Sequence, residues 1–295
     1  MAPEVLEWDK MTDVQRAKSA RSMEAYAGMV DRMDYNIGRV LSYLKDQDLY
    51  DNTEIIFMSD NGAEGFSYEA QPLTGGETLA YIERYFDNSL ENIGSANSFV
   101  WYGGRWAQAA TAPSRLYKKF STEGEVRVLF ILKSVRPSLS QPICHHFCTV
   151  MDIVPTILDQ AHVEKPGKVY GGREVQPIRG ASWVPFLSEQ ASRPHPEDYI
   201  AGWQSWWGLF GQAALRKGRW KLNWVDRPFG SESWQLFDLV EDPGEIDDLS
   251  SVEIGKAAEL LAHWEDYARE TGVIGLTPDI KALATRDDME IRATG

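Results

Sequence analysis

The sequence has few cysteines, and it lacks any long apolar run. Its 295 residues include two cysteines, Cys144 and Cys148, which are too few for a disulfide framework and fit a reducing compartment. No apolar run approaches the roughly 20 residues that a membrane-spanning helix needs, and the first residues do not begin a signal peptide. We therefore expect a cytoplasmic protein.

Basic residues are also in deficit. The chain carries 44 acidic against 30 basic residues, a formal net charge of −14, and such a surface repels phosphate backbones and anionic lipid. We expect neither nucleic acid nor a membrane surface as a partner. What is abundant is apolar content, at 43%. A chain of this length and composition can bury a sizeable core in one large or two modest domains.

The first third of the chain predicts a long helix followed by a strand. From Gln15 to Gln47 apolar residues recur at spacings of three and four, which is typical of one amphipathic helix. Residues 54–59 are a short, nearly continuous apolar run, which suits a buried parallel strand. Helix and strand together favour an α/β sheet with helices on its faces, and they place Asp60 and Asn61 at the carboxyl end of the strand. The predicted apolar stripe of the helix comprises Met23, Tyr26, Ala27, Val30, Ile37, Leu41 and Leu44.

The middle of the chain is less regular. Residues 63–124 are rich in glycine and aromatics and show little periodicity, so we interpret them as a long, ordered, functional loop. Residues 126–132 predict a second buried strand. Residues 149–159 have helical spacing, with Pro155 near the first turns.

The last third predicts a small antiparallel sheet capped by a helix. Lys217-Gly218 has the composition of a hairpin turn, and residues 253–269 place their apolar side chains at helical spacing. We divide the chain into a partial α/β core, 1–166, and a small sheet-and-helix subdomain, 167–295. The predicted strands are Tyr199–Trp203, Leu209–Leu215, Trp220–Val225 and Trp234–Leu239.

Several segments, taken in order along nearly the whole chain, carry a resemblance to a known family. They are Met29–Val40, Phe57–Gly62, Asp87–Gly94, Trp106–Lys118, Val150–Thr156 and Leu236–Glu245. Together they resemble type I sulfatases, and more closely the bacterial arylsulfatases. The resemblance implies an α/β fold related to alkaline phosphatase, and calcium-dependent hydrolysis of a small-molecule sulfate ester.

The family nucleophile is a formylglycine made from the first residue of a Cys/Ser-x-Pro-x-Arg segment, and the matched segments do not include it. Thr111-Ala-Pro-Ser-Arg115 has the Pro and Arg spacing, but threonine cannot give the aldehyde and the position differs, so we interpret this match as a coincidence. We expect the chain to be a C-terminal portion that is inactive by itself, with the missing N-terminal half as a possible partner.

Asp60 and Asn61 resemble the family's downstream metal ligands. Ca²⁺ takes six to eight oxygens, and a carboxylate beside an amide can supply two or more at the mouth of a sheet. The alternative is an Asn-Gly hairpin turn, which the lack of strand alternation after Ala63 weakens. The resemblance favours the metal role. The remaining ligands lie outside the matched segments, so we expect an incomplete Ca²⁺ site.

Lys118 matches a family lysine that contacts the sulfate group. A cation aimed at an oxygen that gains charge in the transition state is a strong electrostatic stabiliser. The alternative is a solvated surface lysine beside Lys119, which composition alone favours.

Two further clusters are weaker candidates. Residues 144–148, Cys-His-His-Phe-Cys, contain side chains that can bind zinc. Structural zinc sites, however, draw their ligands from two separated pairs. We therefore expect ordinary thiols here, and we assign His145 no role. An aromatic cluster could stack on a sugar ring or an aryl group, although packing is the commoner use. Its members are Trp203, Trp206, Trp207 and Phe210.

The stretch from Gly124 to Leu129 departs from the family pattern Gly-Gly-x-Arg-Val-Pro. Replacing a glycine and a proline alters backbone freedom close to Lys118. Two alternatives to a sulfatase therefore stay open, namely a non-catalytic binding protein derived from the family, and a phosphoester or phosphonate hydrolase of the same superfamily.

Overall fold

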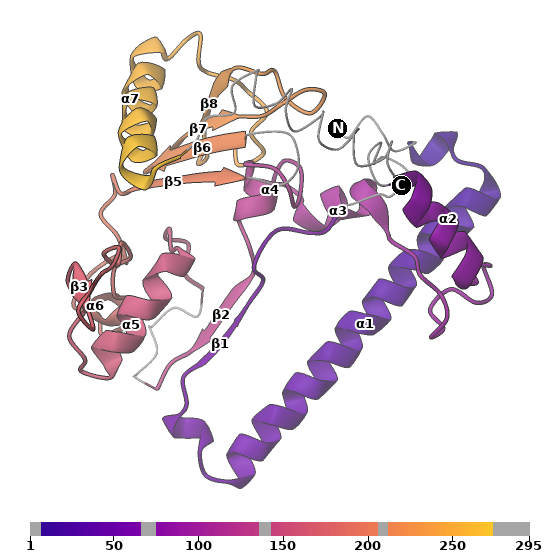
Figure 1. The fold of residues 1–295 in the computed structure, drawn as a ribbon, viewed down its shortest axis with the longest axis horizontal. Helices are drawn as coiled ribbons and strands as arrows, with labels where there is room; N and C mark the ends of the chain where they lie inside the picture. Colours follow the sequence, from indigo (N-terminus) through magenta and orange to yellow (C-terminus); the bar gives the residue numbers. More distant parts are fainter. Residues whose placement is uncertain (1–6, 66–74, 136–142, 206–211, 274–295) are drawn as a thin grey trace. The chain divides into compact units, whose positions relative to one another are not determined.

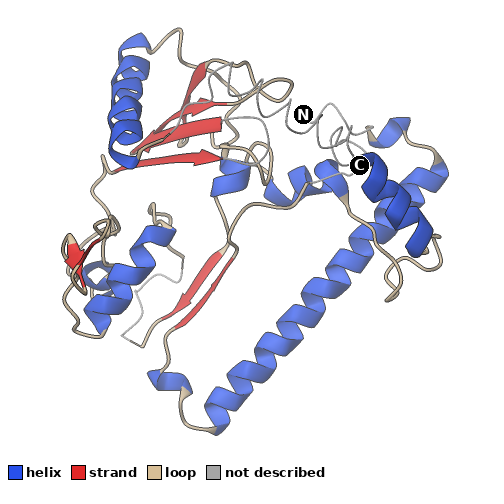
Figure 2. Ribbon diagram, viewed as in Figure 1, coloured by secondary structure: helices blue, strands red, loops and turns tan. Residues whose placement is uncertain are grey.

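The computed structural model describes residues 7–65, 75–135, 143–205 and 212–273 (Figure 1). Contacts divide the chain into two compact units. Unit 1 comprises residues 1–42, 58–129 and 200–295, and unit 2 comprises residues 43–57 and 130–199. Helices and short strands occur in both (Figure 2). Our division at residue 166 stays a prediction.

The predicted long helix is confirmed as α1, Asp13–Asp46. It begins with a reciprocal cap, because the Gln15 backbone N–H donates to the Thr12 hydroxyl and the Thr12 N–H donates to the Gln15 side chain. The predicted apolar stripe, however, is not buried. Tyr26 and Val30 of the stripe are 38% and 40% exposed, and Met23 and Leu41 are half-buried. Ser22 is the buried residue of this helix. Among the described residues the stripe is thus partly covered, and the ring of Tyr102 lies 4.9 Å from that of Tyr26.

The segment interpreted as a long loop contains helices, and that interpretation was wrong. α2 spans Gly75–Tyr85 and α3 spans Gly103–Thr111. Both begin with paired glycines, which are poor helix formers and obscured the start of each pattern. The one-turn helix α4, Glu123–Val126, likewise takes the place of the predicted strand start.

The C-terminal sheet is confirmed as four antiparallel strands in the order β5-β6-β7-β8. A turn at Gly218 joins β6 to β7, and α7, Ile254–Thr271, packs on the sheet. Leu215, Leu222 and Leu260 form the centre of this core and are at most 1% exposed. The strands are β5 Ile200–Ser205, β6 Gln212–Lys217, β7 Trp220–Trp224 and β8 Trp234–Asp238.

Unit 2 contains the predicted α/β strands. β1, Ile55–Met58, pairs with β2, Phe130–Lys133. We predicted two buried strands, but neither strand is fully buried, because each pairs with a single strand among the described residues. β2 also begins four residues later than predicted. The short elements are η2 Tyr50–Asn52, η4 Val150–Asp152, β3 Val169–Tyr170, β4 Arg173–Glu174 and α6 Val184–Leu187.

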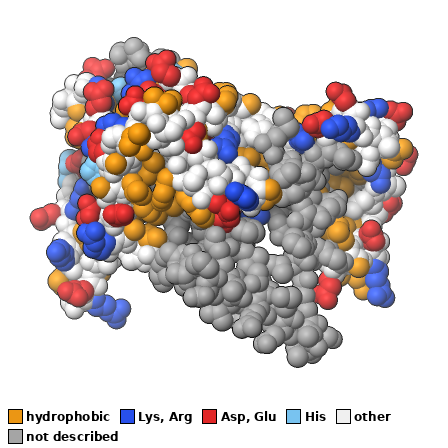
Figure 3. All heavy atoms as spheres, turned by 90° about the horizontal axis from the view of Figure 1, so that it is seen from above, with side chains coloured by type: hydrophobic (Ala, Val, Ile, Leu, Met, Phe, Trp, Pro, Cys, Tyr) orange, Lys and Arg blue, Asp and Glu red, His pale blue; other side chains and the backbone are white. Residues whose placement is uncertain are grey.

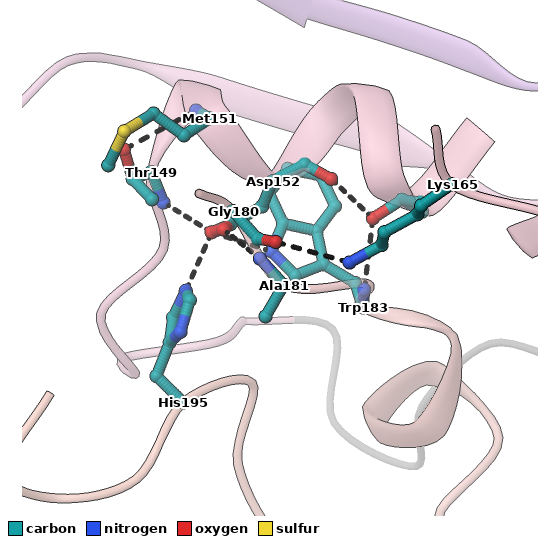
Figure 4. A network of polar contacts seen from close by, with 9 residues as sticks. Thr149, Met151, Asp152, Lys165, Gly180, Ala181, Trp183 and His195 are labelled. Atoms are coloured by element: carbon teal, nitrogen blue, oxygen red, sulfur yellow. Dashed lines mark hydrogen bonds and ion pairs between the residues drawn. The ribbon is translucent and has the colours of Figure 1, made fainter. Parts of the chain in front are cut away.

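The predicted helix around Pro155 is confirmed as α5, Ile153–Gln160. The buried Asp152 carboxylate before it accepts from the backbone N–H of Thr149, the indole of Trp183 and a ring nitrogen of His195 (Figure 4). The Ala181 N–H is a fourth donor to this buried carboxylate, and four such hydrogen bonds stabilise its charge. This network fixes the entrance of α5.

Acidic and basic side chains are interspersed on the face drawn in Figure 3, so the net charge of −14 is not gathered there into one acidic patch. No described helix is both long enough and apolar enough to cross a bilayer. The cytoplasmic location stays a prediction.

Candidate functional site

The Asp60–Asn61 loop follows β1 directly. It is held at its start by the Ser59 backbone N–H, which donates to the Leu129 carbonyl at 3.1 Å, and the Ser59 hydroxyl donates to the Asn61 carbonyl at 2.7 Å. The Asp60 side chain is exposed and Asn61 is half-buried. The residue after them starts no hairpin, since residues 59–65 contain no strand. The alternative of an Asn-Gly hairpin is therefore wrong.

Glycines allow three segments of unit 1 to meet backbone against backbone. A Cβ on Gly62 would lie 1.9 Å from the Gly124 carbonyl oxygen, and a Cβ on Gly124 would lie 1.9 Å from the Leu116 carbonyl oxygen. No side chain tolerates such distances to a backbone atom. The contact brings the Asp60 loop, the Lys118 segment and α4 together.

Lys118 lies beside this loop. Its backbone N–H donates to the Ala63 carbonyl at 2.9 Å, and its Nζ pairs with Glu64 at 2.9 Å. The hydrogen bond that Lys118 donates to Glu64 raises the pKa of Lys118, with smaller contributions from the charges of Asp60 and Glu125. The charge of Asp60 thus acts on Lys118, and the predicted roles of both residues stay predictions.

The backbone around Lys118 is strained. Leu116 has φ 58° and Lys119 has φ 96°, a region that residues with a Cβ occupy at a cost of about 1–3 kcal/mol. The Gln108 side chain secures the segment by accepting from the Leu116 N–H at 2.7 Å. The Thr111 hydroxyl donates to the Leu116 carbonyl at 2.7 Å. Thr111 therefore has a structural role in this turn.

Glu125 is a site residue that the sequence did not single out. Burial raises the pKa of its carboxyl to about 7, although the backbone N–H groups of Gly62 and Lys119 and the charge of Lys118 act in the opposite direction. Glu125 occupies the second glycine position of the family pattern, and the departure drew attention only to backbone freedom. Its backbone φ is not positive, so this substitution adds a carboxyl to the site and causes no backbone strain.

A buried ion network holds α4 against the C-terminal sheet. The Lys221 Nζ, which is inaccessible to solvent, lies 2.9 Å from carboxylate oxygens of Glu123 and of Glu245. Burial tends to raise the pKa of Glu123, but Lys221 outweighs it and the net pKa is lowered. For Glu245 burial prevails and the pKa is raised. The Ser121 N–H adds a bond of 3.0 Å to Gln212.

The predicted metal ligands do not complete a calcium site. Within the described ranges no group of three or more His, Cys, Asp or Glu side chains is arranged to hold an ion, and two side chains fall short of the six to eight oxygens that Ca²⁺ takes. At residues 144–148 both thiols are free and exposed, and the expectation of ordinary thiols there stays a prediction.

The aromatic cluster falls mostly outside the described residues. Trp206, Trp207 and Phe210 are not described, and Trp203 lies on β5 opposite Ala214. Its role stays a prediction.

Comparison with known proteins identifies the class. Residues 7–163 match the Sulfatase family model, and the chain belongs to the sulfatase family. It is therefore a sulfatase by family.

Two curated relatives support this assignment. An uncharacterized sulfatase of Schizosaccharomyces pombe is 46% identical over 93% of this chain and 48% of its own length. The arylsulfatase of Klebsiella aerogenes is 32% identical over 60% of this chain and 37% of its own. The chain spans about half the length, or less, of the curated relatives it matches.

Solved structures confirm the fold class. Ps i-CgsB, in complex with k-i-k-neocarrahexaose, aligns with a TM-score of 0.57 at 22% identity, over 90% of this chain and 47% of that one. The yidJ protein of Bacteroides fragilis, a candidate sulfatase, aligns with a TM-score of 0.52 at 15% identity, over 92% and 46%. The chain thus has part of the alkaline-phosphatase-like α/β fold, with the small C-terminal sheet and helix.

Proposed function

We propose that this chain supplies part of the active site of a calcium-dependent, arylsulfatase-type sulfatase. In this proposal Lys118 contacts the sulfate group of a small-molecule sulfate ester, and Asp60 and Asn61 are two of the metal ligands. One observation carries it: the Lys118 N–H is bonded to the carbonyl of Ala63, next to the Asp60 loop. This bond ties the cation and the two candidate ligands to one short stretch of backbone.

The chemistry of Lys118 follows from its charge. A raised pKa keeps the ammonium protonated at neutral pH, and a fixed cation stabilises the negative charge that develops on sulfate oxygens as the ester bond breaks. Its present partner, Glu64, is half exposed at 51%, so the carboxylate can turn to solvent when an anion takes its place.

Calcium would add charge neutralisation at the same end of the strand. Asp60 and Asn61 fit such an ion in ligand type but not in number. We propose that the other ligands and the formylglycine nucleophile come from the part of the sulfatase relatives that this chain does not match. That part is the partner we propose for the chain.

Complementation tests the proposal. The 295-residue chain with an aryl sulfate and CaCl₂ should show no turnover. Turnover should appear when it is co-expressed, in cells that make formylglycine, with the segment of the S. pombe relative that it does not match. Lys118→Met should abolish the restored activity while Lys119→Met retains it.

Two results would contradict the proposal. Hydrolysis by the chain alone would show that the nucleophile is already present. Full restored activity in Lys118→Met would remove Lys118 from sulfate binding. An aryl phosphonate in the same assay distinguishes a sulfatase from a phosphonate hydrolase.

A further inference from the structure

The helix α5, with the turn η4 before it, has its apolar side chains on the outside. Val150, Val154 and Ile157 follow one another at helical spacings of four and three, and they are 64%, 52% and 51% exposed. The buried positions between them include Asp152 and Thr156, which are polar. A helix at the surface of a protein normally shows the reverse pattern. The three exposed residues form the α5 stripe.

The strand pair β1–β2 in the same unit is also open. No third strand joins it in the described part of the chain (Figure 1), and two strands alone make a marginal sheet. The ring of Phe130 on β2 lies 5.2 Å from that of Trp183. The next residue, Ile131, points to the opposite face, because side chains alternate along a strand, and it is 54% exposed. That face and the outer strand edges are therefore available to a partner.

The position of these two surfaces in the sequence indicates what covers them. Both lie within residues 7–163, the range that matches the Sulfatase family model. By contrast, the C-terminal sheet buries its apolar side chains under α7, where Leu215 and Leu222 are at most 1% exposed. The S. pombe relative contains about as much chain again beyond the part that this chain matches. A polypeptide of that length is large enough to cover both surfaces.

We propose that the α5 stripe and the open face of β2 at Ile131 form the interface with the part of the sulfatase relatives that this chain does not match. The proposal rests on the proposed function, which makes that part the partner. The partner adds strands to β1–β2 through main-chain hydrogen bonds and buries the α5 stripe under apolar side chains. Because β1 leads directly into the Asp60 loop, the same strand pairing positions that loop.

Co-purification tests the interface. The 295-residue chain, carrying an affinity tag, is co-expressed with the unmatched segment of the S. pombe relative, and the amount of segment that elutes with it is measured. Val154→Glu and Ile157→Glu should each abolish co-elution, since a charge buried without a partner is costly. Val252→Glu, which changes an apolar side chain that is 73% exposed elsewhere in the chain, should retain it. Circular dichroism of each variant alone checks that it folds.

Hydrogen exchange provides a second measurement that needs no variant. In the complex of the original chain, the backbone amides of β2 and α5 should become more protected than in the chain alone. The amides of α7, which packs on the C-terminal sheet, should be unchanged. Protection that appears elsewhere but not in β2 and α5 would overturn the interface.

The outcomes separate the interface from the proposed function. Co-elution and restored sulfatase activity at the original level in both stripe variants would overturn the interface and leave the proposed function in place. Co-elution of the original chain without restored activity would overturn the proposed function and leave the interface in place. No co-elution with the original chain would overturn both. If the stripe variants only reduced self-association of the chain, the stripe would contact a second copy, and the proposal would be wrong.

Discussion

At Gly62 and Gly124 the neighbouring atoms are main-chain atoms rather than side chains. A main-chain carbonyl cannot move away as the end of a long side chain can. The sequence showed both glycines, yet nothing in their composition distinguished them from Gly28. The constraint on Gly62 comes from Gly124, far along the chain, and that on Gly124 comes from the carbonyls of Arg115 and Leu116. Asp60 and Lys118 could be named in advance from the family resemblance, whereas the burial of Glu125 and the positive φ of Lys119 depend on tertiary contacts.

Substitution of Gly124 by alanine should destabilise the chain. The new Cβ would lie 1.9 Å from the Leu116 carbonyl oxygen, and relieving such an overlap costs about 1–3 kcal/mol. The control is Gly28→Ala on α1, where nothing lies within 4 Å and helix propensity predicts a gain of up to about 1 kcal/mol. Urea unfolding measures both, and equal stabilities would contradict the packing described.

The Glu125 carboxyl should make stability depend on pH. Its pKa is raised to about 7 in the folded chain from 4.5, so between these values the folded chain holds a proton that the unfolded chain has lost. Its contribution to stability therefore falls as the pH rises through this window. Glu125→Gln should gain stability relative to the original chain from pH 4.5 to 7, with no further gain above it.

The matched control for this measurement is Glu77→Gln, at an exposed position of α2. Its stability difference from the original chain should stay constant over the same pH range. If the stability difference between Glu125→Gln and the original chain were also constant, ionisation of Glu125 would not lower the stability of the folded chain.

Among the elements, those with a long or repeated pattern were predicted well. α1 and the four C-terminal strands follow from periodicity because each extends over several side-chain repeats. α2 and α3 were missed, since short helices that start with glycines give a weak pattern. The predicted strand 126–132 begins only at Phe130, because Val126 ends the helix α4 and residues 127–129 form a loop. Glu123 of α4 pairs with Lys221 of β7. A local pattern contains no information about that distant lysine.

The ion network between α4 and β7 should be costly to break. Lys221→Met leaves Glu123 and Glu245 buried without their cation, and removing one partner of such a network costs about 3–5 kcal/mol. Lys217→Met, which removes the partly exposed pair with Glu259, should cost less than about 1 kcal/mol. Thermal or urea unfolding distinguishes them. A similar loss in both variants would show that burial does not matter to the Lys221 network.

On the scale of the whole molecule, the fold class was predictable because the ordered segments resemble one family. The two units were not predictable from sequence order, since unit 1 joins stretches on both sides of residues 130–199. Lys221 and Glu123 are 98 positions apart. The sequence also could not show that the apolar stripe of α1 is only partly buried.

Apolar side chains that α1 exposes outside the predicted stripe should make the chain self-associate. Met29, Val40 and Tyr43 are 70%, 59% and 61% exposed, and neighbouring exposed apolar side chains drive association. Sedimentation velocity at increasing concentration should show growing particles. Met29→Glu should reduce association more than Ser42→Glu, which adds the same charge at an exposed polar position of α1. A concentration-independent monomer would contradict this.

The way unit 1 is assembled has a consequence for proteolysis. Trypsin has exposed targets at Lys168 and Arg173, within unit 2. A cut there ends the covalent continuity between residues 1–129 and 200–295, but the Lys221 contacts to Glu123 and Glu245 remain. The nicked protein should migrate as two bands under denaturing conditions and as one particle under native ones. The Lys118 segment would then keep its support from β7 by non-covalent contacts alone.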